Sequence, residues 1–158
     1  MKVVNLNHFL IRSANLEKSR EFFEHIVGLR VGPRPPFRFP GYWMYSEAGH
    51  PLVHLAARAG SGSSELQRYL GAPREIGGAG SLDHISFLCA ELPAFERRLK
   101  EHHWRYFGRT VPDEGLHQVF VEGPDGVRFE FMFPSHETAS WSCDDAGVSD
   151  NPPLNGEN

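Results

Sequence analysis

The chain contains one pattern twice, at a constant spacing of 76 residues. The run LNHFLIR around His8 matches LDHISFLC around His84, and PLVHLAA around His54 matches VRFEFMF around Glu130. An internal repeat of about 50 residues indicates two copies of one supersecondary unit, neither of which can bury its hydrophobic face alone. We therefore interpret the chain as two equivalent modules, each beginning and ending at a residue that can bind a metal.

The hydrophobic periodicity of each module predicts the order β-α-β-β-β, and therefore an α+β fold. In the first module, Asn15 is a suitable N-cap and Gly28 a suitable end for the helix LEKSREFFEHIVG. The four prolines between residues 33 and 40 exclude a regular central strand. They favour a stiff, extended loop that is either a connector or a pocket wall.

Changes in composition predict the division of the chain. Module one is expected at 1–57, a linker rich in Gly and Ser at 58–81 with a short helix at SSELQRYL, and module two at 82–134. The linker glycines lack the spacing of a phosphate-binding loop. The polar tail at 135–158 has a composition typical of disorder, with Trp141 as a candidate anchor to the body.

Composition also argues against several classes of function. A net charge of -4 and a pI near 6.1 provide no broad positive field, so nucleic acid is not an expected partner. The N-terminal run is interrupted by polar residues, no apolar run is long enough to span a membrane, and two cysteines do not make a disulfide framework. We expect a soluble cytoplasmic protein that acts on a small molecule.

Strand alternation puts the candidate ligands on one kind of face. Glu130 lies opposite the four large apolar residues of VRFEFMF, and His54 and His84 lie opposite the apolar residues of their own strands. His8 points away from the face of Phe9. All four side chains are therefore expected on the face that the helices do not cover.

Two imidazoles and one carboxylate on adjacent strands form a facial triad that leaves positions on a divalent metal open. We predict that His8, His84 and Glu130 bind one metal ion, with Fe, Mn, Zn, Ni and Co all compatible with these donors. His54 has three possible roles: a fourth ligand, an acid/base group that works near neutral pH, or part of the pocket lining.

The walls of a substrate pocket follow from the same alternation. In LHQVFVE the two valines suit the helix side, so Gln118 and Phe120 are expected to face the site. The 76-residue shift relates these two residues to Tyr42 and Met44. All four are candidate substrate contacts, with core packing as the alternative for Met44 and Phe120.

The opening NHF, the second-module DHISF and the closing GPDGVRFEF resemble the vicinal oxygen chelate superfamily, which includes glyoxalases, bleomycin resistance proteins and extradiol dioxygenases. The resemblance covers roughly residues 5–133. It implies two β-α-β-β-β modules that form an incomplete barrel around a metal site, and it matches His8, His84 and Glu130 to the recurrent ligands. It also implies a homodimer, in agreement with the need to cover edge strands.

The chain differs from the better-known members of the superfamily at the positions of His54 and Phe120, and these differences bear on which reaction it can catalyse. Glyoxalase I and its close relatives have a Glu ligand where this chain has His54, and methylmalonyl-CoA epimerases have Gln. Extradiol dioxygenases resemble the chain in the two-His-one-Glu set, but they have a Tyr where this chain has Phe120, and usually a second pair of modules.

The leading hypothesis is a metal-dependent lyase or isomerase that acts on a small oxygenated substrate through a metal-stabilised enediolate, with His54 moving a proton. One alternative is an Fe(II) dioxygenase that cleaves a ring or another C–C bond. The other alternative is a metal-free protein that binds a drug or metabolite and confers resistance.

Overall fold

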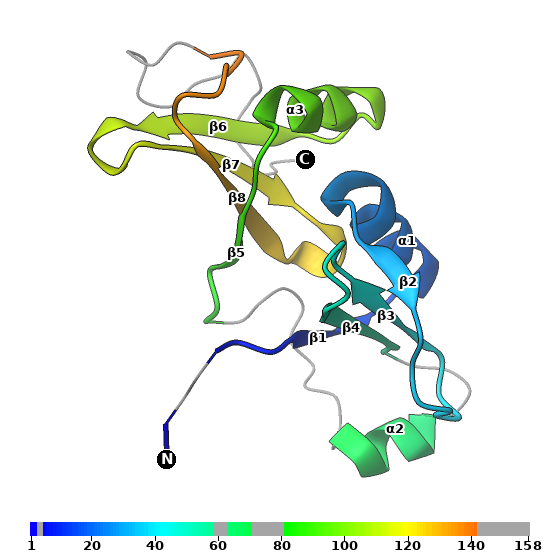
Figure 1. Ribbon diagram of the computed structural model, residues 1–158. Helices are drawn as coiled ribbons and strands as arrows, with labels where there is room; N and C mark the ends of the chain where they lie inside the picture. Colours follow the sequence, from blue (N-terminus) through cyan, green and yellow to red (C-terminus); the bar gives the residue numbers. More distant parts are fainter. Residues whose placement is uncertain (3–4, 59–62, 71–80, 142–158) are drawn as a thin grey trace. The chain divides into compact units, whose positions relative to one another are not determined.

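A computed structural model describes residues 1–2, 5–58, 63–70 and 81–141, and the chain divides into two compact units, Met1–Glu75 and Ile76–Asn158. The boundary between the units falls inside the predicted linker. The elements of the first unit are β1 (Phe9–Ser13), α1 (Leu16–Glu21), η1 (Phe22–Val27), β2 (Arg30–Gly32), β3 (Gly41–Tyr45), β4 (Pro51–Ala57) and α2 (Ser63–Leu70) (Figure 1). Those of the second are β5 (His84–Leu88), α3 (Leu92–Glu101), β6 (Tyr106–Val111), η2 (Pro112–Glu114), β7 (Leu116–Glu122), η3 (Pro124–Gly126) and β8 (Arg128–Pro134).

The first unit is a four-stranded sheet in the order β1-β4-β3-β2, in which β1 pairs with β4 in parallel and the other pairs are antiparallel. Asn15 caps α1, since its side chain accepts a hydrogen bond from Lys18 N at 3.0 Å. The predicted helix continues as a π-helical turn, η1, which ends at Gly28 with a φ of +82°. The buried side chains of η1 are those of Phe22, Phe23 and Ile26.

The second unit repeats this arrangement with the sheet order β5-β8-β7-β6 and a parallel β5–β8 pair. Helix α3 packs on one face of the sheet, where the Phe95 ring lies 4.6 Å from the ring of Phe131 and 5.5 Å from that of Phe133. Two modules of the order β-α-β-β-β are therefore present, and the fold prediction is confirmed.

The segment rich in proline is held in place by Arg34. Its guanidinium donates to the carbonyl oxygens of Phe39 and Gly41, both at 3.1 Å. Phe39 is buried in a small cluster with Ala56 of β4 and Leu66 of α2. The predicted linker helix is thus real and packs on the first unit, whereas residues 59–62 and 71–80 of the linker lie outside the described residues.

The first seven residues of the tail pack on the second unit. The Glu137 carboxylate accepts hydrogen bonds from the backbone N–H groups of Glu91 and Leu92, at the start of α3. The backbone carbonyl of Glu137 bonds to His117 Nε2 at 3.0 Å, and Trp141 Nε1 donates to Thr110 Oγ1 at 3.0 Å. Trp141 therefore anchors this segment, as expected, whereas residues 142–158 of the tail lie outside the described residues.

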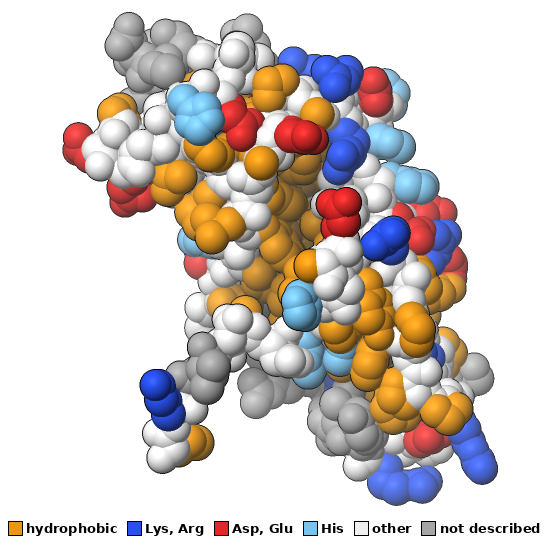
Figure 2. Space-filling model, viewed as in Figure 1, with side chains coloured by type: hydrophobic (Ala, Val, Ile, Leu, Met, Phe, Trp, Pro, Cys, Tyr) orange, Lys and Arg blue, Asp and Glu red, His pale blue; other side chains and the backbone are white. Residues whose placement is uncertain are grey.

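On the face drawn in Figure 2 the basic side chains are scattered, and several of them lie beside acidic side chains and histidines. Among the described helices, none combines the length and the apolar character that are needed to cross a membrane.

Replacing Trp141 by alanine is expected to lower the free energy of unfolding by about 2 kcal/mol, because the ring packs on Gly108 and its N–H bonds Thr110. Chemical denaturation of the full chain measures the change. The control is His136→Ala, which alters an exposed side chain in the same segment and should change stability by less than about 0.5 kcal/mol. Equal stabilities for both variants would show that Trp141 does not anchor the segment.

Candidate functional site

In the first unit, the imidazole of His54 lies between two other rings. The Trp43 ring stacks on it at 4.1 Å with an interplanar angle of 2°, and the His8 ring stacks at 3.9 Å and 21°. Trp43 and His54 are directly paired across β3 and β4, which explains why their rings share one face. The stack fixes the plane of the His54 ring.

His54 is a buried imidazole with an unused nitrogen. Its Nε2 is inaccessible to solvent and has no hydrogen-bond partner among the described residues. Burial, followed by the proximity of the His8 charge, lowers the pKa of His54 from 6.5 to about 4. The ring is therefore neutral near pH 7, the form that binds a metal or accepts a proton.

In the second unit, the parallel pairing of β5 with β8 brings His84 beside Glu130. His84 Nε2 lies 3.4 Å from Glu130 Oε2, and Glu130 is 6% exposed. The Phe120 ring, directly opposite Glu130 on β7, meets the His84 ring edge to face at 5.8 Å. These three side chains lie on the sheet face opposite α3, as the strand alternation predicts.

His8 and His84 are oriented in the same way by their preceding neighbours. His8 Nδ1 lies 2.6 Å from Asn7 Oδ1, and His84 Nδ1 lies 2.8 Å from Asp83 Oδ1. The hydrogen bond from His84 is also the main cause that lowers the pKa of Asp83. With Nδ1 occupied in both rings, Nε2 is the nitrogen available to a ligand.

Neither Asn7 nor Asp83 was among the residues predicted for the site. The signal that could have found them is the repeat itself, because they are separated by the same 76 residues as the two histidines.

Two predicted substrate contacts lie on the other face of the sheet. The Tyr42 hydroxyl donates to Glu17 of α1, and Met44 is fully buried opposite Val53. The prediction that Tyr42 and Met44 face the site together with His54 is therefore wrong.

The physical reason is a difference of one residue between the two hairpins. Trp43 pairs with His54, eleven positions later, whereas Phe120 pairs with Glu130, ten positions later. Because side chains alternate along a strand, a slip of one residue moves every side chain to the other face. The residue that matches Phe120 across the repeat is therefore Trp43.

The other two predicted contacts have the expected orientation. Gln118 and Phe120 belong to the strand positions that alternate with the buried Val119 and Val121. Gln118 is 9% exposed and its Oε1 accepts a hydrogen bond from Arg109 Nε at 2.6 Å. Their contact with a substrate stays a prediction.

The described residues contain no group of three or more His, Cys, Asp or Glu side chains close enough together to hold a metal ion. Each unit by itself contains one pair of such side chains, His8 with His54 in the first and His84 with Glu130 in the second. Imidazole nitrogen and carboxylate oxygen are donors that fit divalent iron, manganese, cobalt, nickel or zinc. The unpartnered Nε2 of His54 and the oriented rings of His8 and His84 fit a role of these nitrogens as metal donors.

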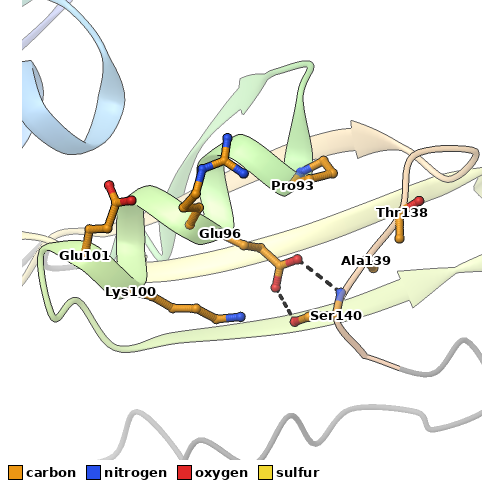
Figure 3. Close-up of a pocket in the computed structure, with 8 residues that line it drawn as sticks. Pro93, Glu96, Lys100, Glu101, Thr138, Ala139 and Ser140 are labelled. Atoms are coloured by element: carbon orange, nitrogen blue, oxygen red, sulfur yellow. Dashed lines mark hydrogen bonds between the residues drawn. The ribbon is translucent and has the colours of Figure 1, made fainter.

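A groove of about 410 Å³ lies between α3 and the segment 138–140, which belongs to the tail (Figure 3). The buried carboxylate in it, Glu96, is already engaged by the Ser140 backbone N–H, the Ser140 hydroxyl and the Tyr106 hydroxyl. These contacts fasten the tail segment to α3. With its one buried carboxylate engaged in this way, the groove is a weaker candidate than the face that carries His84 and Glu130.

Comparison with known proteins shows which family and fold the chain shares. The chain is 25% identical over 134 residues to Glyoxylase I 4 of Arabidopsis thaliana, an alignment that covers 82% of this chain and 71% of the relative. Among solved structures, it resembles a glyoxalase family protein from Bacillus anthracis, with a TM-score of 0.61 at 16% identity, covering 85% of this chain and 98% of that one.

Two further solved structures share the fold. The antibiotic binding protein TnmS3 from Streptomyces sp. CB03234 has a TM-score of 0.58 at 18% identity and covers 85% of this chain and 99% of its own. The lactoylglutathione lyase from Agrobacterium tumefaciens has a TM-score of 0.57 at 14% identity, with coverages of 84% and 95%. The sequence profile of one family matches residues 5–131. The chain belongs to the Glyoxalase/Bleomycin resistance protein/Dioxygenase superfamily.

Proposed function

We propose that the protein is a divalent-metal-dependent enzyme that carries out lyase or isomerase chemistry on a small oxygenated substrate. His8, His84 and Glu130 are the proposed metal ligands, and His54 is the proposed acid/base group. The observation that carries the proposal is the matched orientation of His8 and His84, whose Nδ1 atoms are both held by a neighbouring side-chain oxygen. This arrangement supports binding through both Nε2 atoms.

A divalent metal bound by these residues supplies Lewis-acid polarisation of neighbouring oxygens on the substrate. The carboxylate of Glu130 contributes the one negative charge of the set, which balances part of the charge of the metal. His84 is already within 3.4 Å of that carboxylate, so little rearrangement within the second unit is needed for both to act as ligands.

His54 is proposed to move a proton at Nε2. The neutral ring is the form that accepts a proton, and the low pKa of about 4 keeps it in that form at neutral pH. Stacking on Trp43 holds the ring in one plane, which positions Nε2 without using it in a hydrogen bond. The alternative role of His54, a fourth metal ligand, uses the same nitrogen.

Relatives support this class of chemistry by their names, which include Glyoxylase I 4 and lactoylglutathione lyase. A second candidate function is Fe(II)-dependent cleavage of a C–C bond, because two His and one Glu leave positions open for a diol and O₂. The third is metal-free binding of a small compound on the aromatic ring of Phe120, as the name of the antibiotic binding neighbour suggests. A homodimer in the cytoplasm is proposed in each case.

The first test is elemental analysis of the purified full chain. We expect about one divalent metal per chain, and loss of that metal in His84→Ala and in Glu130→Gln, because each substitution removes a ligand. The exposed His136 provides the control, since His136→Ala should retain the metal. Zinc or nickel without oxygen consumption would contradict the dioxygenase alternative, and a protein that binds no metal would contradict the enzyme proposal.

A second test concerns the orientation of His84. Replacing Asp83 by alanine removes the acceptor of the Nδ1 hydrogen bond, so we expect metal affinity to fall about 10-fold. Titration of the metal-free protein with Zn²⁺ or Co²⁺ measures this affinity. Asp113→Ala, at an exposed carboxylate in η2, should leave it unchanged. An Asp83→Ala variant with unaltered affinity would show that this contact does not support the ligand.

A third test uses the pKa of His54 in metal-free protein. The folded-state pKa of about 4 is below the ordinary 6.5, so the unfolded chain binds an additional proton between these values. Stability from this residue is therefore complete above pH 6.5 and decreases as the pH falls towards 4. Between pH 7 and 4.5 we expect the free energy of unfolding to fall by about 1 to 2 kcal/mol less in His54→Gln than in the original protein. This value is reduced to allow for solvent screening.

Denaturant unfolding of the chelator-treated protein at the two pH values measures this loss. His50→Gln alters an exposed imidazole in a turn of the same unit and should retain the pH dependence of the original protein. If His54→Gln also retained it, His54 would not be held neutral by burial.

A further inference from the structure

Arg109 lies on the same face of the second sheet as the proposed ligands. It is on β6, opposite Gln118, and it alternates with Gly108 and Thr110, which contact Trp141 on the other face. Its Nε donates to Gln118 Oε1 at 2.6 Å, and its guanidinium carbon lies 5.4 Å from the centre of the Phe120 ring. The cation is therefore placed by two contacts within the sheet.

Neither contact neutralises the charge of Arg109. Gln118 is a neutral amide and Phe120 is an aromatic ring, and no carboxylate among the described residues pairs with this guanidinium. Arg128 on β8 of the same sheet provides a contrast, because its Nε donates to Glu122 at 2.7 Å in an ion pair. Arg109 thus retains its full charge and the N–H donors of both terminal nitrogens.

Arg109 is exposed, and two contacts orient its guanidinium before any ligand arrives. Gln118 is 9% exposed, so its amide cannot turn freely towards solvent. Phe120 is itself supported by the Phe107 ring at 6.2 Å. A planar cation that is held on an aromatic face and by one hydrogen bond loses less conformational freedom when it binds than a solvated surface arginine does.

Phe120 connects this cation with the proposed ligands. The ring lies 5.4 Å from the Arg109 guanidinium carbon and 5.8 Å from the centre of the His84 ring, and it is paired with Glu130. A small molecule lying across Phe120 would therefore reach His84 at one end and Arg109 at the other. The terminal N–H groups of Arg match the two oxygens of a carboxylate.

We propose that Arg109, oriented by Gln118 and Phe120, binds a carboxylate of the substrate, so that the substrate is a small organic acid carrying oxygens that the metal can chelate. The assignment of the chelated oxygens rests on the proposed function. The assignment of the carboxylate rests on Arg109 alone. Carboxylate is preferred to phosphate because a single unpaired guanidinium matches one negative charge.

The test compares two probes that differ at the carboxyl group alone: 3,4-dihydroxybenzoate, which is an anion, and its uncharged methyl ester. Both have the same vicinal hydroxyl groups, and the comparison with Arg109→Gln separates the effect of the charge from that of the added methyl group. Binding to the full chain is measured by ligand-observed NMR and calorimetry, with the protein both loaded with Zn²⁺ and treated with chelator. We expect the acid to bind at least about 10-fold more tightly than the ester, because of the charge-assisted hydrogen bonds to Arg109.

The variant Arg109→Gln should bind acid and ester equally, with ester affinity and metal content unchanged. Arg105→Gln, at an exposed position just before β6, should retain the preference for the acid. No preference in the original protein, a preference that persists in Arg109→Gln, or no binding of either probe would overturn the inference. Failure of the proposed function has a different signature: no metal is retained, yet the chelator-treated protein still prefers the acid and loses this preference in Arg109→Gln.

Discussion

Parallel pairing of the first and last strands of each unit is the constraint on which its pair of candidate ligands depends. In the second unit, β5 can lie parallel to β8 only because helix α3 returns the chain across one face of the sheet. That face is closed by aromatic packing between Phe95 and Phe131, which leaves the other face for polar side chains. His84 and Glu130, 46 residues apart, meet there as a consequence.

The same constraint operates in the first unit with a different result. β1 is parallel to β4, so His8 just before β1 stacks on His54 of β4. Where the second unit has a carboxylate beside an imidazole, the first has two imidazoles and an indole. Within the part of the chain that the structure describes, the rings of His8 and Trp43 flank His54 and no carboxylate is paired with it, which favours a neutral ring. This distinguishes the proposed role of His54 from that of Glu130.

A metal site and a site for an organic anion place opposite demands on one sheet face. The proposed metal calls for neutral or anionic donors, whereas a substrate carboxylate calls for a cation. The second sheet separates these demands by the Phe120 ring, with His84 and Glu130 on one side and Arg109 on the other. Within the described residues Arg109 forms no ion pair with Glu130, a contact that would neutralise both groups.

The sequence by itself determined the repeat, the order of elements in each module and the face on which His54, His84 and Glu130 lie. These features follow from the periodicity of the local sequence. The ends of the first helix, at Asn15 and Gly28, were also predicted from local sequence. The tertiary structure decided the register of β3 against β4. This register places Trp43, and not Tyr42 or Met44, on the sheet face of His54. It also decided the partners of Arg109, Asp83 and Trp141. The length of the hairpin decides the register, because one added residue moves the side chains of a strand to the opposite face without changing the hydrophobic pattern of the sequence. The partners of Arg109, Asp83 and Trp141 depend on contacts between side chains, which a local pattern does not contain.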